Sequence, residues 1–260
     1  MNPYFPHDSY QTPADTPCHW LDRLAMGSRA YLHTYVIWEI IKGRWLVGKN
    51  QYDRAAWAAT AYAIFKMVEG CNGRFQISGL DNIRALGHPV VFISNHMSSM
   101  EANLFGCLLP QPREVSFVIK ESLTRYPIFG PVAEALAPIT VGRRNPREDL
   151  QKVLSEGGYK LQNGRSIILF PQHTRTATFV PSEFNSLGIK LAKRADVPVI
   201  PVAVKTDFLG NGRYLRDFGS LNRNKPIHFA FGTPFSVKNS KQAHHHVLNF
   251  IQHHLDNWQM

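Results

Sequence analysis

The sequence predicts an α/β fold, with a largely parallel central sheet flanked by helices and an N-terminal helical hairpin before it. The chain has 260 residues, of which 44% are hydrophobic and 18% charged, enough to build the core of one large domain. Short apolar runs recur from about residue 74 onwards, and helical stretches separate several of them. Strands that alternate with helices are typical of a parallel sheet covered on both faces.

The N-terminal part divides into two segments. Residues 1–20 are polar and rich in proline, which predicts a flexible arm and neither a secretory signal nor a transit peptide. Residues 21–72 show helical periodicity in two pieces, 21–42 and 52–70, and the basic stretch 42–49 between them predicts a turn. We therefore expect an arm followed by a helical hairpin.

Two interpretations of the hairpin remain open. Apolar helices edged by Trp, Lys and Arg are typical of helices that lie in a bilayer interface. The first piece fits this pattern, with Leu32, Val36 and Ile40 at helical spacing and Trp38 beside them. The alternative is a hairpin that packs on its own domain. No run reaches ~18 uncharged apolar residues, so we expect no membrane-spanning helix.

Residues 73–260 are predicted to form the α/β domain. Between its strands we expect helices at 147–162 and 183–195, and an amphipathic helix at 240–257 closes the chain. The predicted strands are 75–78, 90–93, 115–119, 139–141, 166–170, 197–204 and 227–231.

The charge favours an anionic partner. The chain has 29 Lys and Arg against 19 Asp and Glu, a formal net charge of +10. Such a charge suits nucleic acid, phosphate-bearing molecules or a lipid surface, and composition does not choose among them. Cys18, Cys71 and Cys107 are far apart and form no CxxC pattern, which indicates neither a disulfide framework nor a zinc site and fits a reduced cytosolic environment.

A histidine and a carboxylate follow one of the apolar runs. His96 and Glu101 lie in residues 94–101, directly after the predicted strand 90–93. On one continuous helix the two side chains would point ~140° apart, so they can meet only where a loop passes into a helix. A carboxylate on one imidazole nitrogen prepares the other nitrogen to take a proton. The pair therefore suits a general base, although a capping or core contact would give the same pattern.

Arginines follow two other predicted strands. The strand 166–170 is followed by Thr174 and Arg175, and the strand 139–141 by Arg143. The guanidinium fork makes two parallel charge-assisted hydrogen bonds to phosphate. Each arginine alone is typical of a solvated surface, but together with His96 they predict one basic, catalytic rim.

The order of these segments resembles the lysophospholipid and glycerol-phosphate acyltransferase family (1-acylglycerol-3-phosphate O-acyltransferase-like) over roughly residues 74–236. Residues 95–101, Asn-His-Met-Ser-Ser-Met-Glu, are similar to its first motif. Residues 139–143, an apolar strand that ends in arginine, resemble the second. Residues 170–175, Phe-Pro-Gln-His-Thr-Arg, resemble the third, and the proline-rich strand at 197–201 resembles the fourth.

The resemblance implies transfer of a fatty acyl group from a thioester, acyl-CoA or acyl carrier protein, to a hydroxyl of a lysolipid. His96 would be the general base and Glu101 its partner. No cofactor and no metal is implied, and the enzyme would lie on the cytoplasmic side of a membrane, peripheral or monotopic, against an anionic surface. The residues expected to bind substrate are Lys120, Arg143, Gln172, Thr174 and Arg175.

Two residues of the third motif depart from the family pattern. Gln172 stands where the family favours Glu, and His173 where it favours Gly. A different acceptor or a loss of activity would explain them, and the intact His96 and Glu101 favour the different acceptor. Other hypotheses are a hydrolase that acts on acyl thioesters or esters, and an inactive basic protein that binds membrane or nucleic acid. We expect no nucleic acid, because the charge is spread along the chain.

Overall fold

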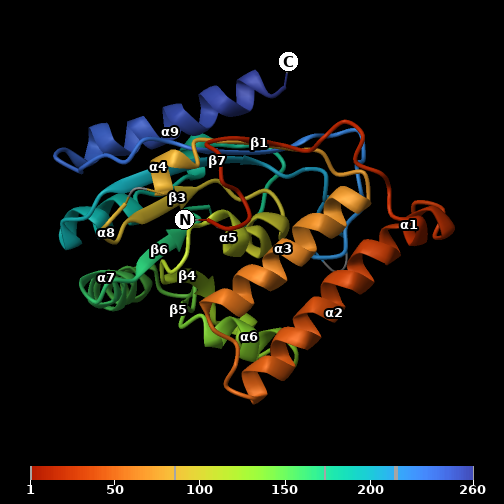
Figure 1. Ribbon diagram of the computed structural model, residues 1–260. Coiled ribbons are helices and arrows are strands. Elements are labelled where there is room, and N and C mark those ends of the chain that lie inside the picture. Colours follow the sequence, from red (N-terminus) through yellow and green to blue (C-terminus); the bar gives the residue numbers. More distant parts are fainter. Residues whose placement is uncertain (1, 85, 173, 214–215, 260) are drawn as a thin grey trace.

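The computed structural model describes residues 2–84, 86–172, 174–213 and 216–259. Within these residues an eight-stranded sheet forms the centre, in the order β1-β2-β8-β7-β3-β6-β4-β5 (Figure 1). The strands are β1 (Tyr10–Gln11), β2 (Phe75–Ser78), β3 (Val91–Ser94), β4 (Val115–Lys120), β5 (Ile139–Val141), β6 (Ser166–Leu169), β7 (Val199–Lys205) and β8 (Ile227–Phe231).

The sheet is largely parallel, as predicted. Strands β7, β3, β6, β4 and β5 run in one direction, while β8 is antiparallel to β7 and parallel to β2. Every residue of β3, β6 and β7 is buried, which explains their nearly continuous apolar sequences. The carboxyl ends of the five parallel strands therefore meet along one edge of the sheet.

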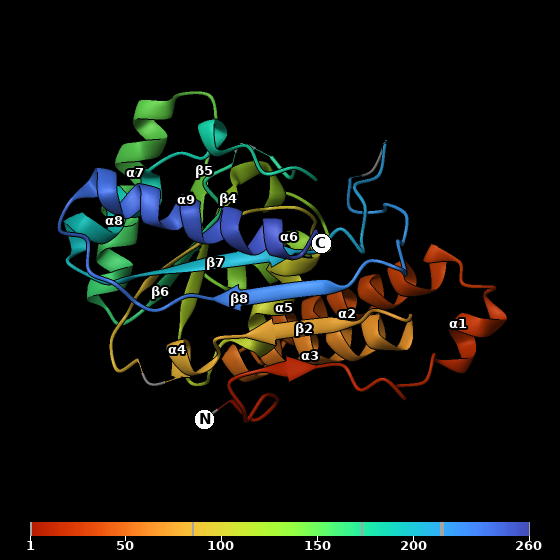
Figure 2. The ribbon, with the colours of Figure 1, turned by 90° about the horizontal axis from the view of Figure 1, so that it is seen from above.

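Helices cover both faces of the sheet. Helices α3 and α5 lie on one face, and α7, α8 and α9 lie on the other (Figures 1 and 2). Gly106 of α5 allows the close approach of α3, because an added Cβ would stand 2.8 Å from the Cβ of Ala61. The helices are α1 (Trp20–Leu24), α2 (Arg29–Gly48), α3 (Arg54–Gly70), α4 (Asp81–Arg84), α5 (Met100–Leu108), α6 (Phe129–Ala135), α7 (Pro146–Gln162), α8 (Leu187–Ala195) and α9 (Ser240–Asn257).

Residues near the N-terminus pack into the folded core. The expectation of a flexible arm over residues 1–20 is therefore wrong where these residues are anchored. Strand β1 pairs with β2 at the edge of the sheet. The Phe5 side chain is fully buried, and the Asn2 amide donates to the carbonyls of Cys107 and Leu108 at 2.8 and 2.9 Å. The segment is polar and rich in proline on average, so its composition does not reveal the few side chains that anchor it.

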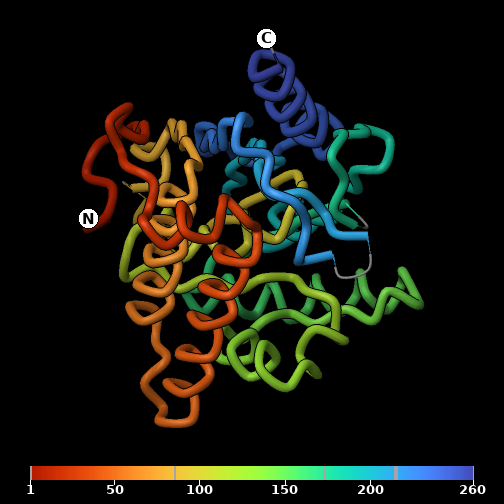
Figure 3. The backbone as a smooth tube through the Cα atoms, turned by 90° about the vertical axis from the view of Figure 1, so that its right-hand side faces the viewer, coloured from red at the N-terminus to blue at the C-terminus, as the bar shows by residue number. Residues whose placement is uncertain are grey.

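The predicted hairpin is present as α2 and α3, which lie side by side (Figures 1 and 3). Its turn falls later than expected, because α2 continues through residues 42–48. Gly43 does not end the helix, since it lies inside the packed face, where an added Cβ would stand 3.1 Å from the Tyr52 ring. Among the described residues, no helix has both the length and the apolar character to cross a bilayer.

Candidate active site

His96 and Glu101 meet where β3 passes into α5. His96 lies two residues after Ser94, which ends β3, and Glu101 is the second residue of α5. Nδ1 of His96 lies 2.8 Å from Oε1 of Glu101. The carboxylate is fully buried, whereas 21% of the His96 side chain is exposed. When Nδ1 carries the proton and donates a hydrogen bond to Glu101, Nε2 is the nitrogen that can accept a proton.

The Glu101 carboxylate sits among hydrogen-bond donors. Oε1 also accepts from the backbone N–H groups of Met97 and Ser98, at 2.6 and 3.0 Å. Oε2 accepts from the hydroxyls of Ser98 and Thr206, at 3.0 and 2.7 Å. Burial raises the pKa of this carboxyl, but the hydrogen bond and charge of His96 and the Thr206 hydroxyl outweigh it and lower the pKa overall. Glu101 is therefore held in its ionised form.

Contacts with β7, and with a residue after it that the sequence did not single out, support the pair. The Asn95 amide donates to the carbonyl of Val204 and accepts from its N–H, at 2.8 and 2.9 Å, which ties the His96 loop to β7. Thr206, the residue after β7, reaches Glu101 as described. The sequence carries no local signal for Thr206, because its role depends on β7 lying next to β3.

The loop after β6 holds the backbone of His96. The Gln172 side-chain oxygen accepts from the His96 N–H at 2.6 Å, and its amide nitrogen donates to Oγ1 of Thr176 at 2.7 Å. The Thr176 N–H donates to the His96 carbonyl at 3.0 Å. The Phe170 ring stacks on the imidazole, with ring centroids 4.3 Å apart. Gln172, expected to bind substrate, is buried behind His96; His173 lies outside the described residues.

Thr174 and Arg175 lie in the same loop, at the carboxyl end of β6. The Thr174 hydroxyl is exposed and accepts from Arg216. The Arg175 side chain is 15% exposed, and its Nη1 lies 2.5 Å from Oδ1 of Asp217, which belongs to the connection between β7 and β8. Because β6 is the neighbour of β3, Arg175 and His96 share one stretch of the sheet edge.

Lys120 and Arg143 lie farther along this edge. Lys120 ends β4 and Arg143 follows β5, so they are two and three strands away from β3. At the usual strand spacing this is ~10 Å and ~14 Å from the β3 backbone. The backbone N–H groups of Gly142 and Arg143 donate to the Asp149 carboxylate at 2.9 Å each, which fixes the turn that carries Arg143.

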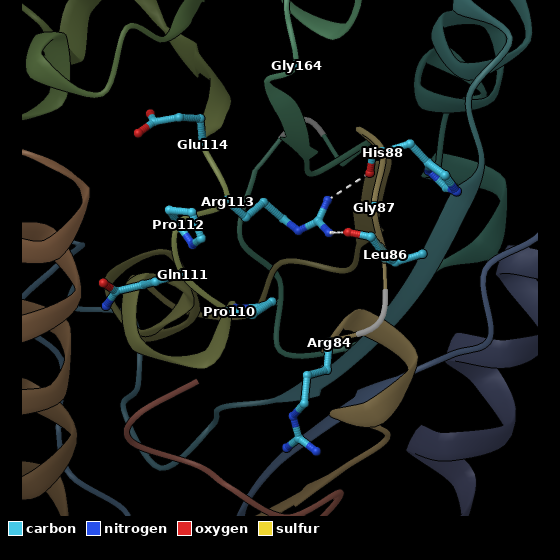
Figure 4. A pocket seen from close by; sticks show the side chains of 10 residues that line it. All are labelled: Arg84, Leu86, Gly87, His88, Pro110, Gln111, Pro112, Arg113, Glu114 and Gly164. Atoms are coloured by element: carbon cyan, nitrogen blue, oxygen red, sulfur yellow. Dashed lines mark hydrogen bonds between the residues drawn. The ribbon is translucent and has the colours of Figure 1, made fainter. Parts of the chain in front are cut away.

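A surface pocket of about 350 Å³ lies at the amino ends of the parallel strands, where β3 and β4 begin (Figure 4). The Arg113 guanidinium crosses it and donates to the carbonyls of His88, at 2.9 Å, and Leu86. Its walls share no residue with the predicted site. We assign Arg113 to holding the loop before β3.

The sequence matches known acyltransferases. The family described as Acyltransferase matches residues 74–205, about half of the chain. A 1-acyl-sn-glycerol-3-phosphate acyltransferase of Pseudomonas aeruginosa is 32% identical over 148 residues, which cover 56% of this chain and 54% of that protein. A lyso-ornithine lipid O-acyltransferase of the same organism is 25% identical over 147 residues, 53% of this chain and 55% of that protein. The chain spans about half the length of these curated relatives.

The fold matches a solved structure. The 1-acyl-sn-glycerophosphate acyltransferase PlsC of Thermotoga maritima superposes with a TM-score of 0.68 at 18% identity, covering 91% of this chain and 96% of that one. At this identity the likeness establishes the fold alone. The family match contains His96, Glu101 and the loop of Arg175 in one continuous segment. The chain therefore belongs to the acyltransferase family.

Proposed function

We propose that the chain is an O-acyltransferase, which moves a fatty acyl group from acyl-CoA or acyl carrier protein to a hydroxyl of a lysophospholipid or related lipid. The observation that carries this proposal is the His96–Glu101 contact at the carboxyl edge of the parallel sheet. Ligand sites of α/β proteins lie at this edge. Membership of the family and the names of the two relatives support the reaction class.

In the proposed mechanism, Nε2 of His96 takes the proton of the acceptor hydroxyl as the oxygen attacks the thioester carbonyl. Glu101 stabilises the imidazolium that forms, since its carboxylate is ionised and directed at Nδ1. The C–O bond forms, the C–S bond breaks, and the imidazolium returns the proton to the leaving thiolate. The cysteines take no part in this route.

The acceptor's anionic group would lie against Arg175, one strand from His96, with the exposed Thr174 beside it. Lys120 and Arg143 would extend the same basic edge towards the larger part of an acyl donor or head group. Arginine suits this role because its fork binds phosphate oxygens in pairs. Gln172 is better assigned to positioning His96, because both ends of its amide are bonded inside the protein.

The assay that tests the proposal supplies labelled acyl-CoA or acyl carrier protein with a panel of lysolipids, and mass spectrometry identifies the products. Diacylated product that forms only when acceptor is present is the expected result. Release of free fatty acid at the same rate with and without acceptor would establish a hydrolase instead. No product under either condition would favour the inactive binding protein.

Replacing Thr206 by valine should lower kcat about tenfold, because Glu101 loses one hydrogen bond and positions the imidazole less firmly. Thr206→Ser keeps the hydroxyl and should restore most of the activity, which separates this role from packing. Initial rates and the thermal unfolding midpoint of both variants are measured. Equal activity in Thr206→Val and the unchanged protein would remove Thr206 from the mechanism.

The N-terminal helices would hold the enzyme on the cytoplasmic side of an anionic membrane. Trp38, Ile41 and Trp45 form an exposed stripe on α2, opposite its packed face. The Lys49 ammonium lies 3.7 Å from the centre of the Trp45 ring, so cation and aromatic ring share this surface. Helix α1 projects beyond the rest of the molecule (Figures 1 and 2) and exposes Trp20, Leu24 and, just after it, Met26. Such surfaces bind at the headgroup level.

Replacing both Trp38 and Trp45 by alanine should weaken binding to vesicles of anionic phospholipid about tenfold or more, because two exposed indole rings are lost. Cosedimentation measures the bound fraction. The control is Tyr159→Ala, which removes an even more exposed aromatic ring from α7 on the other side of the sheet. The same loss in both variants would contradict docking through α2.

A further inference from the structure

The connection between β7 and β8 borders the acceptor side of the site. It carries Asp217 to Arg175, and the next residues are fastened to α2 (Figure 3). Arg29 donates to the carbonyl of Phe218 at 3.3 Å, and Nε2 of the buried His33 lies 2.9 Å from the carbonyl oxygen of Gly219. Asp217 is therefore presented by an anchored segment.

The same segment is closed on itself. The Gly210 N–H donates to the carbonyl of Ser220 at 2.9 Å, and Leu209 and Leu221 form an antiparallel bridge. Gly219 has no room for a side chain, because an added Cβ would stand 1.7 Å from the Gly210 carbonyl oxygen. These contacts fix the backbone that follows Asp217. The connection therefore holds the Asp217 carboxylate beside Arg175.

The ion pair changes what Arg175 can bind. Asp217 occupies one side of the guanidinium, with 56% of its own side chain exposed. A phosphate monoester that displaced Asp217 would leave this carboxylate unpaired next to a second anion. A head group that carries an ammonium beside its phosphate would leave neither side chain unpaired, because its phosphate would face Arg175 and its ammonium would face Asp217. Discrimination of this kind works by penalising the wrong partner.

Other charged side chains in and beside the connection also have partners within the chain. The Lys205 and Lys225 ammonium groups lie 3.0 and 2.6 Å from the Asp207 carboxylate. Arg216 donates to the Thr174 hydroxyl. Arg175 and Asp217 present opposite charges together at the carboxyl end of β6.

We infer that Asp217 sets the acceptor class: the site selects lysolipids whose head group carries an ammonium next to its phosphodiester, with the ammonium on Asp217 and the phosphate on Arg175. This inference rests on the proposed function. It predicts discrimination by head group through a residue outside the motifs of the family.

The test compares kcat/KM, with one acyl thioester, for three 1-acyl lysolipids that differ in head group: phosphate monoester, phosphoglycerol and phosphoethanolamine. The unchanged protein should prefer phosphoethanolamine. Asp217→Asn should lower kcat/KM for phosphoethanolamine about tenfold, raise it severalfold for the phosphate monoester and change it little for phosphoglycerol. The control is Glu156→Gln, which removes an exposed carboxylate from α7 and should leave all three values unchanged.

Three outcomes would overturn the inference. They are a preference of the unchanged protein for the phosphate monoester, an equal effect of Asp217→Asn on all three acceptors, and a gain for the monoester with no loss for phosphoethanolamine. If the unchanged protein acylates no acceptor, the proposed function fails. The head-group preference inferred for Asp217 is then tested by the binding of head-group compounds. Calorimetric titration with glycerophosphoethanolamine and glycerol 3-phosphate should then show a preference for the former that Asp217→Asn removes; equal affinities would overturn it.

Discussion

Replacing His96 by alanine is expected to lower kcat for acyl transfer about 10³-fold, with the fold intact. The imidazole is the group that takes the acceptor proton, and general-base catalysis is worth ~10²–10⁴ in rate. A 10³-fold loss corresponds to about 4 kcal/mol of transition-state stabilisation. Initial rates at saturating acyl donor and acceptor measure the effect, and circular dichroism checks the fold.

The matched control is His88→Ala. His88 is an exposed histidine before the amino end of the same strand, β3, and its backbone carbonyl contact to Arg113 does not need the side chain. The His88→Ala variant should be as active as the unchanged protein. If His96→Ala kept activity within threefold of the unchanged protein, the proposed general base would be wrong.

Replacing Glu101 by glutamine is expected to lower kcat about 10²-fold. The amide has the same shape, and its oxygen can still accept from Nδ1 of His96 and from the N–H groups of Met97 and Ser98. The imidazole therefore keeps its orientation, but the negative charge that stabilises the imidazolium is lost. The rate of the variant measures this charge effect separately from geometry.

A double variant sharpens this test. If Glu101 acts through His96, the variant with both His96→Ala and Glu101→Gln should be no slower than His96→Ala alone, because residues that act as a unit are not additive. Losses that multiply would show that Glu101 contributes by another route. Rates of the two single variants and the double variant, measured side by side, decide between these cases.

The lowered pKa of Glu101 also predicts a pH dependence of stability. Since the folded protein holds this carboxyl at a pKa below its unfolded value, the unfolded chain takes up the proton first as the pH falls. The ionised Glu101 therefore adds stability above the ordinary carboxyl pKa, and this share is lost as the pH falls through the lowered pKa. Urea unfolding of the unchanged protein and of Glu101→Gln should show a stability difference that shrinks on acidification; a constant difference would contradict it.

Much of the fold could be predicted because its signals are local. Strands such as β3 and β6 are buried along their whole length, and this burial appears directly as an apolar run. The junction at residues 94–101 could be predicted in the same way, since helical geometry allows His96 and Glu101 to meet only between a loop and a helix. The arm at residues 1–20 was misjudged because its anchoring depends on partners about a hundred residues away, such as the carbonyls that bind Asn2.

The sequence by itself determined the α/β class, the pairing of His96 with Glu101 and the place of Arg175 after a strand, because each depends on residues near one another in the chain. Tertiary structure decided which groups surround them. The neighbours of β3 are β6 and β7, which lie far along the chain, so only the sheet order brings Gln172 and Thr206 to the catalytic pair. The contact of Asp217 with Arg175 likewise joins two loops 42 residues apart, a separation at which sequence carries no contact information.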